Sequence, residues 1–291
     1  MSQQPTTSFV PGTIGIVGLG LIGGSFSFAL YKKTHAVYVW NRTRTTAEEA
    51  IGKSADGLLT QDTLPLCELV ILAGYPEFNE QWLSDHADQI ASGAVVIDTG
   101  GIKRHTCKTC FALAKGKSWD FVGCHPMAGT EHSGYAHAKG SMFHRAPMVV
   151  VPPEDASEDE KAQMCARLES LLKPCGFASF RSATASFHDA QIAYTSQLAH
   201  VVSNAYVKSP AAQSHKGFSA GSYKDLTRVA KLNPTMWCEL FFENKDNLSN
   251  EIQQMIDHLQ EYLDALNDDD RDRMYKLLEE GVIAKKEAER P

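Results

Sequence analysis

The chain has 291 residues, 43% of them hydrophobic and 22% charged, a composition typical of a soluble globular protein of about two domains. The formal net charge of −7 makes nucleic acid and anionic membranes poor partners, so an anionic ligand must meet a local group of Lys or Arg. No apolar run is long enough to cross a membrane and no secretory leader is present, so we expect a cytoplasmic protein.

The cysteines do not form a metal-binding pattern. Seven are scattered along the chain, and Cys107 and Cys110 form a C-x-x-C pair without a second pair or a nearby histidine to complete a zinc set. Reduced thiols in a cytosolic protein explain this distribution best, and we expect no metal site.

A glycine-rich segment follows the first predicted strand. The β-branched run 13–17 is typical of a buried parallel strand, and residues 25–31 are helix-like. Between them lies G-x-G-x-x-G, which permits a tight turn and brings a pyrophosphate close to a helix N-terminus. This context predicts dinucleotide binding rather than a turn without a ligand. The expected cofactor contacts in the loop are Gly18, Leu19, Gly20, Leu21, Ile22 and Gly23.

The second predicted strand, 36–40, ends where the ribose of the cofactor should bind. An NAD site usually carries Asp or Glu at this point, but here Asn41 is followed by Arg42, Thr43 and Arg44. A neutral amide does not repel a 2′-phosphate, and guanidinium groups can bind it. The pattern favours NADP, with NAD possible. The alternative is that both arginines are solvated loop charges.

Further strands are predicted at 69–73, 94–98, 119–124 and 147–151. Gly74 and Tyr75 follow the first of these and Thr99 and Gly100 the second, so we expect all four at the cofactor. Strands that alternate with helical stretches predict an α/β Rossmann domain with a parallel sheet.

His125 stands at the end of the strand 119–124, directly before Pro126. Proline disfavours the α conformation in the residue before it, so His125 should lie at the carboxyl edge of the sheet, where ligands bind in open α/β folds. An imidazole there can transfer a proton near neutral pH. The alternative is a histidine that fills a turn.

The character of the chain changes after a Pro-Pro linker at 152–155. Long helical patterns cover 158–173, 188–206, 234–266 and 268–289, with one short strand-like run at 176–181. We therefore expect a dinucleotide-binding domain at 1–153 and an all-α domain at 154–291. Long apolar helices of this kind often bury a face against a second subunit, so we expect a homodimer.

Two pairs of residues in the helical half are candidates for catalysis or substrate binding. Ser196 and His200 are four residues apart and should share a helix face, as should Lys224 and Arg228. The guanidinium of Arg228 could hold a carboxylate. Each group also has a plainer explanation, as a satisfied helix histidine and as a solvated basic pair.

Taken together, the motifs resemble those of the prephenate dehydrogenase family. They are GLGLIGGS at 18–25, DTGGIK at 98–103, GCHPMAGTEHSG at 123–134, FHDAQIAYTSQLAH at 187–200, SYKDLTRVA at 222–230 and NPTMWCELFFENK at 233–245. The resemblance implies a Rossmann domain that binds NAD(P)+ and a helical domain that dimerises and closes the substrate cleft. The implied reaction is the oxidative decarboxylation of prephenate to 4-hydroxyphenylpyruvate in tyrosine biosynthesis, with arogenate as the alternative substrate.

The resemblance also implies roles for individual residues. His125 would accept the proton of the ring hydroxyl, and His200, grouped with it as catalytic, would lie in the substrate pocket. Arg228 would bind one of the two prephenate carboxylates. The other expected substrate contacts are Thr130, Glu131 at the pocket mouth, Ser196, Gln197 and Lys224.

The sequence departs from the family pattern at two positions. Relatives commonly carry Ser where this chain has Gly101, so Thr99 and Thr130 become the candidate sources of the missing hydroxyl. Relatives often read S-H-L-P-H where this chain has Gln197 in place of the first His. No regulatory or mutase domain is expected.

Two other functions are compatible with parts of the sequence. A β-hydroxyacid dehydrogenase or an imine reductase shares the two-domain plan but should carry a lysine-based catalytic helix. A non-enzymatic NADP sensor would keep the glycine loop and have no need for His125, His200 and Arg228 together.

Overall fold

The computed structural model describes residues 8–130 and 132–290. The chain folds as two compact units. Unit 1 contains the residues up to Ile192 together with Lys231–Glu243, and unit 2 contains Ala193–Ala230 and the residues from Asn244 onward.

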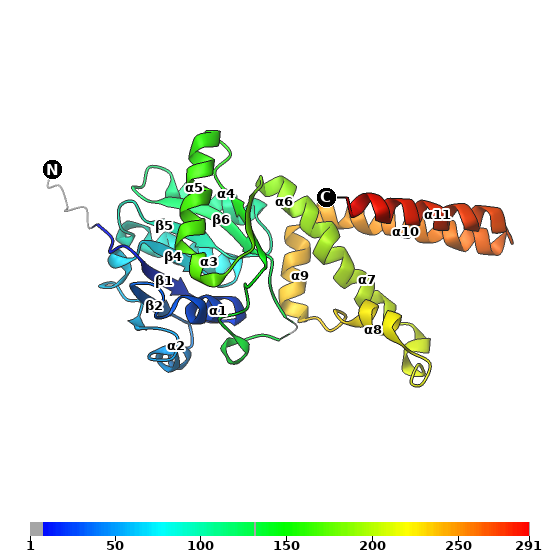
Figure 1. Cartoon of the computed structure of the whole chain (residues 1–291), viewed down its shortest axis with the longest axis horizontal. Coiled ribbons are helices and arrows are strands. Elements are labelled where there is room, and N and C mark those ends of the chain that lie inside the picture. The colour runs from blue at the N-terminus through cyan, green and yellow to red at the C-terminus, as the bar shows by residue number, and fades with distance from the viewer. Residues whose placement is uncertain (1–7, 131, 291) are drawn as a thin grey trace. The chain divides into compact units, whose positions relative to one another are not determined.

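Unit 1 is organised around an eight-stranded sheet with the order β3-β2-β1-β4-β5-β6-β7-β8 (Figure 1). The strands are β1 Thr13–Val17, β2 Ala36–Trp40, β3 Gly57–Leu58, β4 Leu69–Leu72, β5 Val95–Asp98, β6 Asp120–Pro126, β7 Pro147–Val151 and β8 Ser179–Ser182. Neighbours from β3 to β6 pair in parallel, whereas β7 is antiparallel to β6 and parallel to β8. The predicted α/β fold with a largely parallel sheet is confirmed, and β7 and β8 run in the opposite direction.

This topology gathers the predicted cofactor segments at one edge. Because β1, β4, β5 and β6 are parallel, the residues that follow them leave the sheet on the same side. That edge carries the glycine loop, Gly74, the residues after Asp98 and His125. In open α/β sheets, ligands bind outside the carboxyl ends of the strands.

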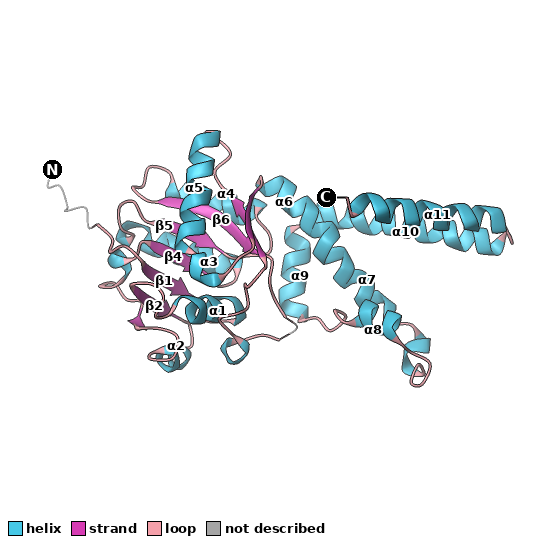
Figure 2. Cartoon of the chain, viewed as in Figure 1, coloured by secondary structure: helices cyan, strands magenta, loops and turns pink. Residues whose placement is uncertain are grey.

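Helices cover both faces of the sheet (Figure 2). Helices α1 Leu21–Leu30, α2 Arg44–Ala50 and α5 Glu158–Leu171 supply one core cluster, and α3 Pro76–His86, α4 Arg104–Ala114 and α6 Ala185–Ile192 supply the other. Short 3-10 turns lie at Leu64–Leu66, Ala87–Gln89, Tyr135–His137 and Lys173–Cys175. Unit 1 also includes α9 Pro234–Glu243.

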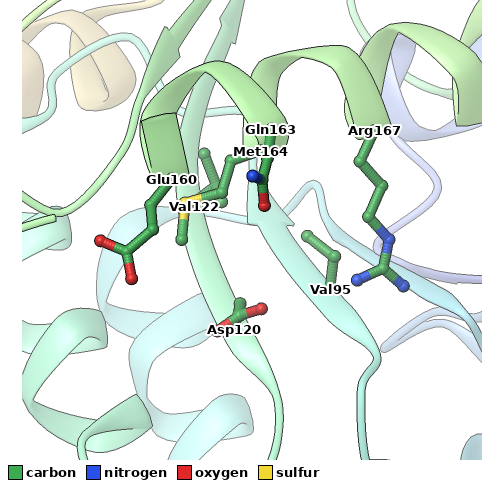
Figure 3. A pocket seen from close by; sticks show the side chains of 7 residues that line it. All are labelled: Val95, Asp120, Val122, Glu160, Gln163, Met164 and Arg167. Atoms are coloured by element: carbon green, nitrogen blue, oxygen red, sulfur yellow. The ribbon is translucent and has the colours of Figure 1, made fainter. Parts of the chain in front are cut away.

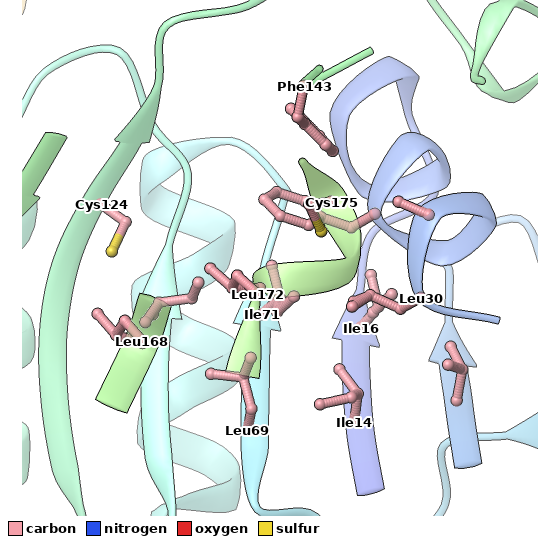
Figure 4. Close-up of a cluster of buried hydrophobic side chains, with 14 of the residues drawn as sticks. Ile14, Ile16, Leu30, Leu69, Ile71, Cys124, Phe143, Leu168, Leu172 and Cys175 are labelled. Carbon is pink, nitrogen blue, oxygen red and sulfur yellow. The ribbon is translucent and has the colours of Figure 1, made fainter. Parts of the chain in front are cut away.

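The two clusters explain the uninterrupted apolar runs of the strands. Side chains alternate across a strand, so Ile14 and Ile16 of β1 enter the first cluster and Val17 enters the second (Figure 4 shows the first). Likewise Ile71 enters the first cluster and Val70 the second. A strand buried on both faces needs hydrophobic residues at successive positions.

The division into units differs from the predicted boundary between residues 153 and 154. Helix α5 packs its buried Leu168 into the first core cluster, and β8 pairs with β7 at the sheet edge. Both elements therefore belong to unit 1, which continues to Ile192. The Pro-Pro linker is a connection within unit 1, from β7 to α5.

Unit 2 is helical, as expected. It contains a π-helix at Ala193–Leu198, α7 Ala199–Tyr206, a 3-10 turn at Pro210–Gln213, α8 Gly221–Thr227, α10 Lys245–Asn267 and α11 Arg271–Ala288. Helices α10 and α11 form an antiparallel pair (Figure 1), in which the Tyr262 hydroxyl donates to the Leu277 carbonyl at 3.3 Å. The single helix predicted over 234–266 is interrupted at Asn244, between α9 and α10. Within the described residues, none of the helices is long and apolar enough to cross a membrane.

Candidate active site

The glycine loop forms the turn that the sequence predicted. Gly18 has φ +94°, and a Cβ at Gly23 would overlap the Gly18 carbonyl oxygen, so both positions require glycine. The space beside Gly20 is open to 4 Å. Helix α1 starts directly after Gly20 without a side-chain cap, and its first turn contains no acidic residue. Its N–H groups and positive dipole end are suited to a pyrophosphate.

Asn41 connects the end of β2 to this loop. Its Oδ1 accepts a hydrogen bond from the Leu19 N–H at 2.9 Å, and its Nδ2 donates to the Thr43 carbonyl at 3.1 Å. Both arginines are exposed, and Arg44 pairs with Glu48 at 2.8 Å. Asn41 therefore shapes the loop, and Arg42 is the arginine better placed to meet a phosphate from solvent.

Polar side chains also hold the segments after β4 and β5. The Asn79 Oδ1 accepts from the Gly74 N–H at 2.9 Å, and the Asp98 Oδ2 accepts from the Gly100 N–H at 2.8 Å. The Thr99 hydroxyl donates to the Leu72 carbonyl at 3.3 Å, so it joins the loop after β5 to the end of β4. Tyr75 is about half exposed at the start of α3.

A buried ion pair lies beneath the β5–α4 loop. The ammonium group of Lys103 contacts the Asp98 carboxylate, and both side chains are almost completely buried. Burial opposes the charge on Lys103, but the Asp98 carboxylate outweighs it and raises the lysine pKa. The second Asp98 oxygen accepts from the Cys124 N–H at 3.1 Å, which ties β5 to the residue before His125.

His125 is the first member of a hydrogen-bonded array. Its Nδ1 lies 2.9 Å from Nε2 of His188, and Nδ1 of His188 lies 2.7 Å from the Asp189 carboxylate. His188 and Asp189 are buried, and His125 is half-buried at the end of β6. The array joins α6 to the carboxyl edge of the sheet, and all three residues belong to unit 1.

The Asp189 carboxylate is anchored at the N-terminus of α4. It accepts from the N–H groups of Lys103 and Arg104 at 2.8 and 2.9 Å and from Arg104 Nε at 3.3 Å. Burial alone would raise the Asp189 pKa, but the hydrogen bonds from His188 and from these N–H groups lower it below its ordinary value. Asp189 is therefore an anion at neutral pH.

This anion determines the protonation of the array. Burial lowers the pKa of His188, and it lowers the pKa of His125 further, with contributions from His188 and Lys103, so both rings are neutral at pH 7. A carboxylate can only accept, so Nδ1 of His188 carries the hydrogen and Nε2 accepts from His125 Nδ1–H. Nε2 of His125 is then the basic nitrogen, as a general base requires.

The predicted residues of unit 2 lie in or after the π-helix. His200 is half-buried, and its Nδ1 donates to the Ser196 carbonyl at 2.8 Å, as an acceptor-only oxygen requires. Ser196 lies within the π-helix, so the α-helical spacing from which a shared face was predicted does not apply to it. Lys224 on α8 and Arg228 just after it are both exposed.

Gln197 differs from the expected substrate contact. Its side chain is 1% exposed, and its Oε1 accepts from Asn244 Nδ2 at 2.8 Å. Within unit 2, this residue supports the local structure and offers almost no surface to a ligand. Thr130 is exposed in the loop after β6, and Glu131 lies outside the described residues.

Gly101 occupies an unhindered position. A Cβ built there would have Leu240 Cδ2, at 3.8 Å, as its nearest contact, and the backbone does not adopt the left-handed conformation. The missing hydroxyl therefore reflects no steric requirement for glycine. In this chain, His188 is the hydrogen-bond partner on the Nδ1 side of His125.

A cavity elsewhere in unit 1 is separate from this chemistry. It has a volume of about 280 Å³ between α5 and the first residues of β5 and β6, lined by Val95, Asp120, Val122, Glu160, Gln163, Met164 and Arg167 (Figure 3). Glu160 completes the capping box of α5, and Arg167 donates to the Gly93 carbonyl at 2.7 Å. These polar groups are used by the fold, at the amino ends of the strands. Among the described residues, no group of His, Cys, Asp or Glu could hold a metal.

Sequence reasoning did not assign roles to His188, Asp189 and Asn244. His188 and Asp189 are neighbours in the motif FHDAQIAYTSQLAH, and an imidazole next to an acid could have indicated a second histidine for His125. Nothing in the local sequence indicates that the chain places α6 beside the end of β6. Asn244 lies in the polar run 243–247, which gives no local signal of a buried amide.

Unit 1 therefore combines a dinucleotide-binding sheet with a neutral, hydrogen-bonded histidine at the same edge, an arrangement suited to a nicotinamide-dependent oxidoreductase. Comparison with known families identifies it more closely. The prephenate dehydrogenase nucleotide-binding domain matches residues 28–179, and the prephenate dehydrogenase dimerization domain matches residues 184–280. The chain belongs to the prephenate dehydrogenase family.

Individual relatives agree with this assignment. Prephenate dehydrogenase of Bacillus subtilis is 26% identical over 91% of this chain and 72% of its own length. Cyclohexadienyl dehydrogenase of Zymomonas mobilis is 26% identical over 94% of both chains. The fold matches Aquifex aeolicus prephenate dehydrogenase in complex with hydroxyphenyl propionate and NAD+, with a TM-score of 0.81, 23% identity and coverage of 97% and 100%. Synechocystis arogenate dehydrogenase gives a TM-score of 0.79 at 24% identity, covering 95% and 99%.

Proposed function

We propose that the protein oxidises and decarboxylates prephenate to 4-hydroxyphenylpyruvate with NADP+ as the preferred oxidant. Family membership limits the chemistry to this class, and one observation supports the proposal most directly. The array of His125, His188 and Asp189 leaves a basic nitrogen at the carboxyl edge of the sheet that carries the glycine loop.

In the proposed mechanism, His125 moves a proton in both directions. A bound nicotinamide supplies the acceptor for the hydride that leaves C4 of the substrate ring. As C4 becomes a carbonyl carbon, Nε2 of His125 accepts the hydroxyl proton. The ring carboxylate then leaves as CO2, its bonding pair enters the ring, and the carbonyl oxygen becomes a phenolate. His125 returns the proton to that oxygen, so the imidazole ends the cycle neutral.

His188 and Asp189 support this transfer in two ways. The hydrogen bond to His188 holds the ring of His125 in the orientation that directs Nε2 outward. When His125 becomes positively charged, the Asp189 anion at the end of the array stabilises the charge through His188. Positioned bases of this kind contribute about 10²–10⁴-fold to rate.

The substrate contacts are proposed from unit 2 and the loop after β6. Arg228 and Lys224 would attract and hold an anionic substrate that the net negative chain otherwise repels. His200, Ser196, Thr130 and Glu131 complete the proposed set. We assign Gln197 a supporting role because it is buried.

The preference for NADP rests on the end of β2. Asn41 replaces the carboxylate typical of an NAD site, and Arg42 is exposed next to it. Replacement of Arg42 by Ala is expected to raise KM for NADP+ about tenfold and to leave KM for NAD+ within about twofold. Equal effects on both cofactors would contradict the preference.

The protein is proposed to act as a homodimer through unit 2. The matched dimerization domain spans 184–280, and the outer faces of α10 and α11 carry a row of exposed apolar side chains: Ile256, Leu259, Leu263, Leu266, Tyr275, Leu278, Val282 and Ile283. All seven cysteines are free thiols, which is compatible with the cytoplasm as its compartment.

A matrix of two substrates and two cofactors tests the proposed function. Purified protein is incubated with prephenate or arogenate and with NADP+ or NAD+, and the absorbance of the reduced cofactor is followed. We expect the highest kcat/KM for prephenate with NADP+. A higher value for arogenate would establish the alternative substrate, and no reduction in any combination would overturn the proposal.

A further inference from the structure

Unit 2 contains a buried pair of amide side chains that the mechanism does not use. Gln197 is 1% exposed and Asn244 is 0% exposed, and Asn244 Nδ2 donates to Gln197 Oε1 at 2.8 Å. The Asn244 Oδ1 in turn accepts from Asn247 Nδ2 at 2.8 Å. The three amides form a directed chain of hydrogen bonds from α10 into the π-helix.

The pair joins two irregular points of the backbone. Gln197 lies in the π-helix Ala193–Leu198, a type of structure that is rare and occurs mostly at functional sites. Asn244 is the residue at which the helical pattern is interrupted, with φ −120° and ψ 27°, and its carbonyl accepts from the Leu248 N–H at the start of α10. The two residues are 47 positions apart in sequence.

The π-helix and the first turn of α7 carry two of the groups proposed to meet the substrate. Ser196 directly precedes Gln197, and His200 bonds the Ser196 carbonyl through Nδ1 at 2.8 Å. The position of the Ser196 backbone therefore contributes to the direction of the His200 ring. Anything that holds residue 197 in place also holds Ser196 and, through it, His200.

We infer that Gln197 and Asn244 form an amide clamp, which holds the π-helix so that Ser196 and His200 face the substrate. Both are positioning residues, because they act through the backbone and touch no reacting atom. A buried amide without a partner is unfavourable, so each side chain fixes the other in one orientation. The inference rests on the proposed function, whose substrate contacts it supports.

The test uses near-isosteric apolar replacements. The variants are Gln197→Met, Asn244→Leu, the two combined, and the exchange Gln197→Asn with Asn244→Gln. Gln253→Ala, an exposed amide on α10 that bonds only within its own helix, is the matched control. For each variant we measure KM and kcat for prephenate, KM for NADP+, Tm, and hydrogen exchange of residues 193–206.

Each single variant should lose stability, because one buried amide loses its partner. The double apolar variant should recover part of the Tm, since the Gln197–Asn244 pair is removed together while the Asn247 amide still loses its acceptor. Its KM for prephenate should remain raised by about fivefold or more, with kcat and KM for NADP+ within about twofold. The reciprocal exchange should restore KM, and the control should match the wild type.

The outcomes separate this inference from the proposed function. If the wild type turns over and the double apolar variant keeps its KM, the clamp has no positioning role and the inference is wrong. If the wild type reduces no cofactor, the proposed function fails. Hydrogen exchange then tests the amide clamp by itself. If the clamp exists, residues 193–206 should exchange faster in the double apolar variant than in the control. Unchanged exchange would overturn the inference.

Discussion

At the scale of single residues, Asp189 both accepts from His188 and anchors the first N–H groups of α4. Asp189→Asn keeps the size of the side chain but removes the negative charge and one of the two acceptor oxygens. We expect kcat to fall about 10–100-fold with little change in KM, because the positive charge on His125 loses its distant anion.

The Tm of each variant is measured together with its kcat. Arg104→Ala removes the side-chain contact with Asp189 at 3.3 Å but leaves the array intact, so it serves as the control. A variant Asp189→Asn with wild-type kcat would show that the array does not assist proton transfer.

The protonation of His125 predicts the pH dependence of activity. Burial and the neighbouring His188 and Lys103 lower its pKa well below the ordinary 6.5. A base is active when unprotonated, so kcat/KM should stay level from pH 8 down to pH 6.5 and fall only below that value. Since folding lowers this pKa, stability should also decrease as pH falls below 6.5, where the unfolded chain binds the proton more readily.

A pH–rate profile of kcat/KM for prephenate checks this prediction. His125→Asn should reduce kcat by about 10²–10⁴-fold at every pH. An acidic limb centred at or above pH 6.5 in the wild type would mean that a different group is being titrated.

The contrast between Gly23 and Gly101 gives a third prediction. Gly23→Ala places a methyl group against the Gly18 carbonyl and should abolish binding of NADP+, as measured by fluorescence titration. Gly101→Ser meets only Leu240 at 3.8 Å and should leave Tm within about 2 °C. A large loss of Tm in Gly101→Ser would show that the site has less room than the structure indicates.

His125 could be recognised from sequence because a strand ending in His-Pro constrains the backbone locally. His188 could not, because its partner is 63 residues away and the contact depends on the packing of α6. The role of Asn41 was also only partly accessible. Its side chain could be read as neutral, but its hydrogen bond to Leu19 depends on how β2 aligns with β1.

At the scale of secondary-structure elements, α9 ends in a carboxyl group that is strongly perturbed. Burial, together with Glu239 and Glu80, raises the pKa of Glu243 from 4.5 to about 7, while His105 opposes and Asp189 adds to the rise. Oε2 of Glu243 is buried without a hydrogen-bond partner. Because folding raises this pKa, the protonated carboxyl group of Glu243 favours the folded state. That contribution is fully present below pH 4.5 and is lost as pH rises through 7.

Glu243→Gln removes this dependence. We expect the variant to have a Tm about 2–4 °C above the wild type at pH 8.5 and about equal to it at pH 5. Differential scanning fluorimetry at both values measures the difference, and the exposed Glu77→Gln on α3 is the control. A Tm difference that is the same at both pH values would contradict the assignment.

The spacing of apolar residues predicts some of the helices and strands but not all of them. Strands β1, β2 and β7 begin and end where the sequence predicted, because most of their residues are buried and apolar. The π-helix could not be predicted, since Ala193–Leu198 has the same apolar spacing as an α-helix. Asn244, where α9 and α10 are interrupted, contacts Gln197 47 positions earlier, and no local pattern contains that contact.

At the scale of the whole molecule, the sequence predicted one α/β half and one helical half, and both are present. It could not place the boundary between them. Proline residues at 152 and 153 indicate a break in local structure, but membership of a unit depends on long-range packing. Leu168 joins the sheet core and β8 pairs with β7, so the first unit extends beyond the linker.

The final prediction concerns assembly. The exposed apolar residues of α10 recur at spacings of three and four, from Ile256 through Leu259 and Leu263 to Leu266, which is the pattern of a helix that packs against a partner. We expect light scattering to give twice the 32.0 kDa chain mass for the wild type. Leu259→Lys combined with Leu278→Lys places charges within this surface and should give the single-chain mass, because unpaired charges disfavour burial.

The control Glu279→Ala alters an exposed residue next to Leu278 and should remain dimeric. Circular dichroism distinguishes dissociation from unfolding, since a dissociated but folded chain keeps its helical signal. A wild type that elutes as a single chain, or a double-lysine variant that stays dimeric, would require a different surface for the partner. Because unit 1 holds the glycine loop and the residues at the end of β2, a dissociated variant should still bind NADP+.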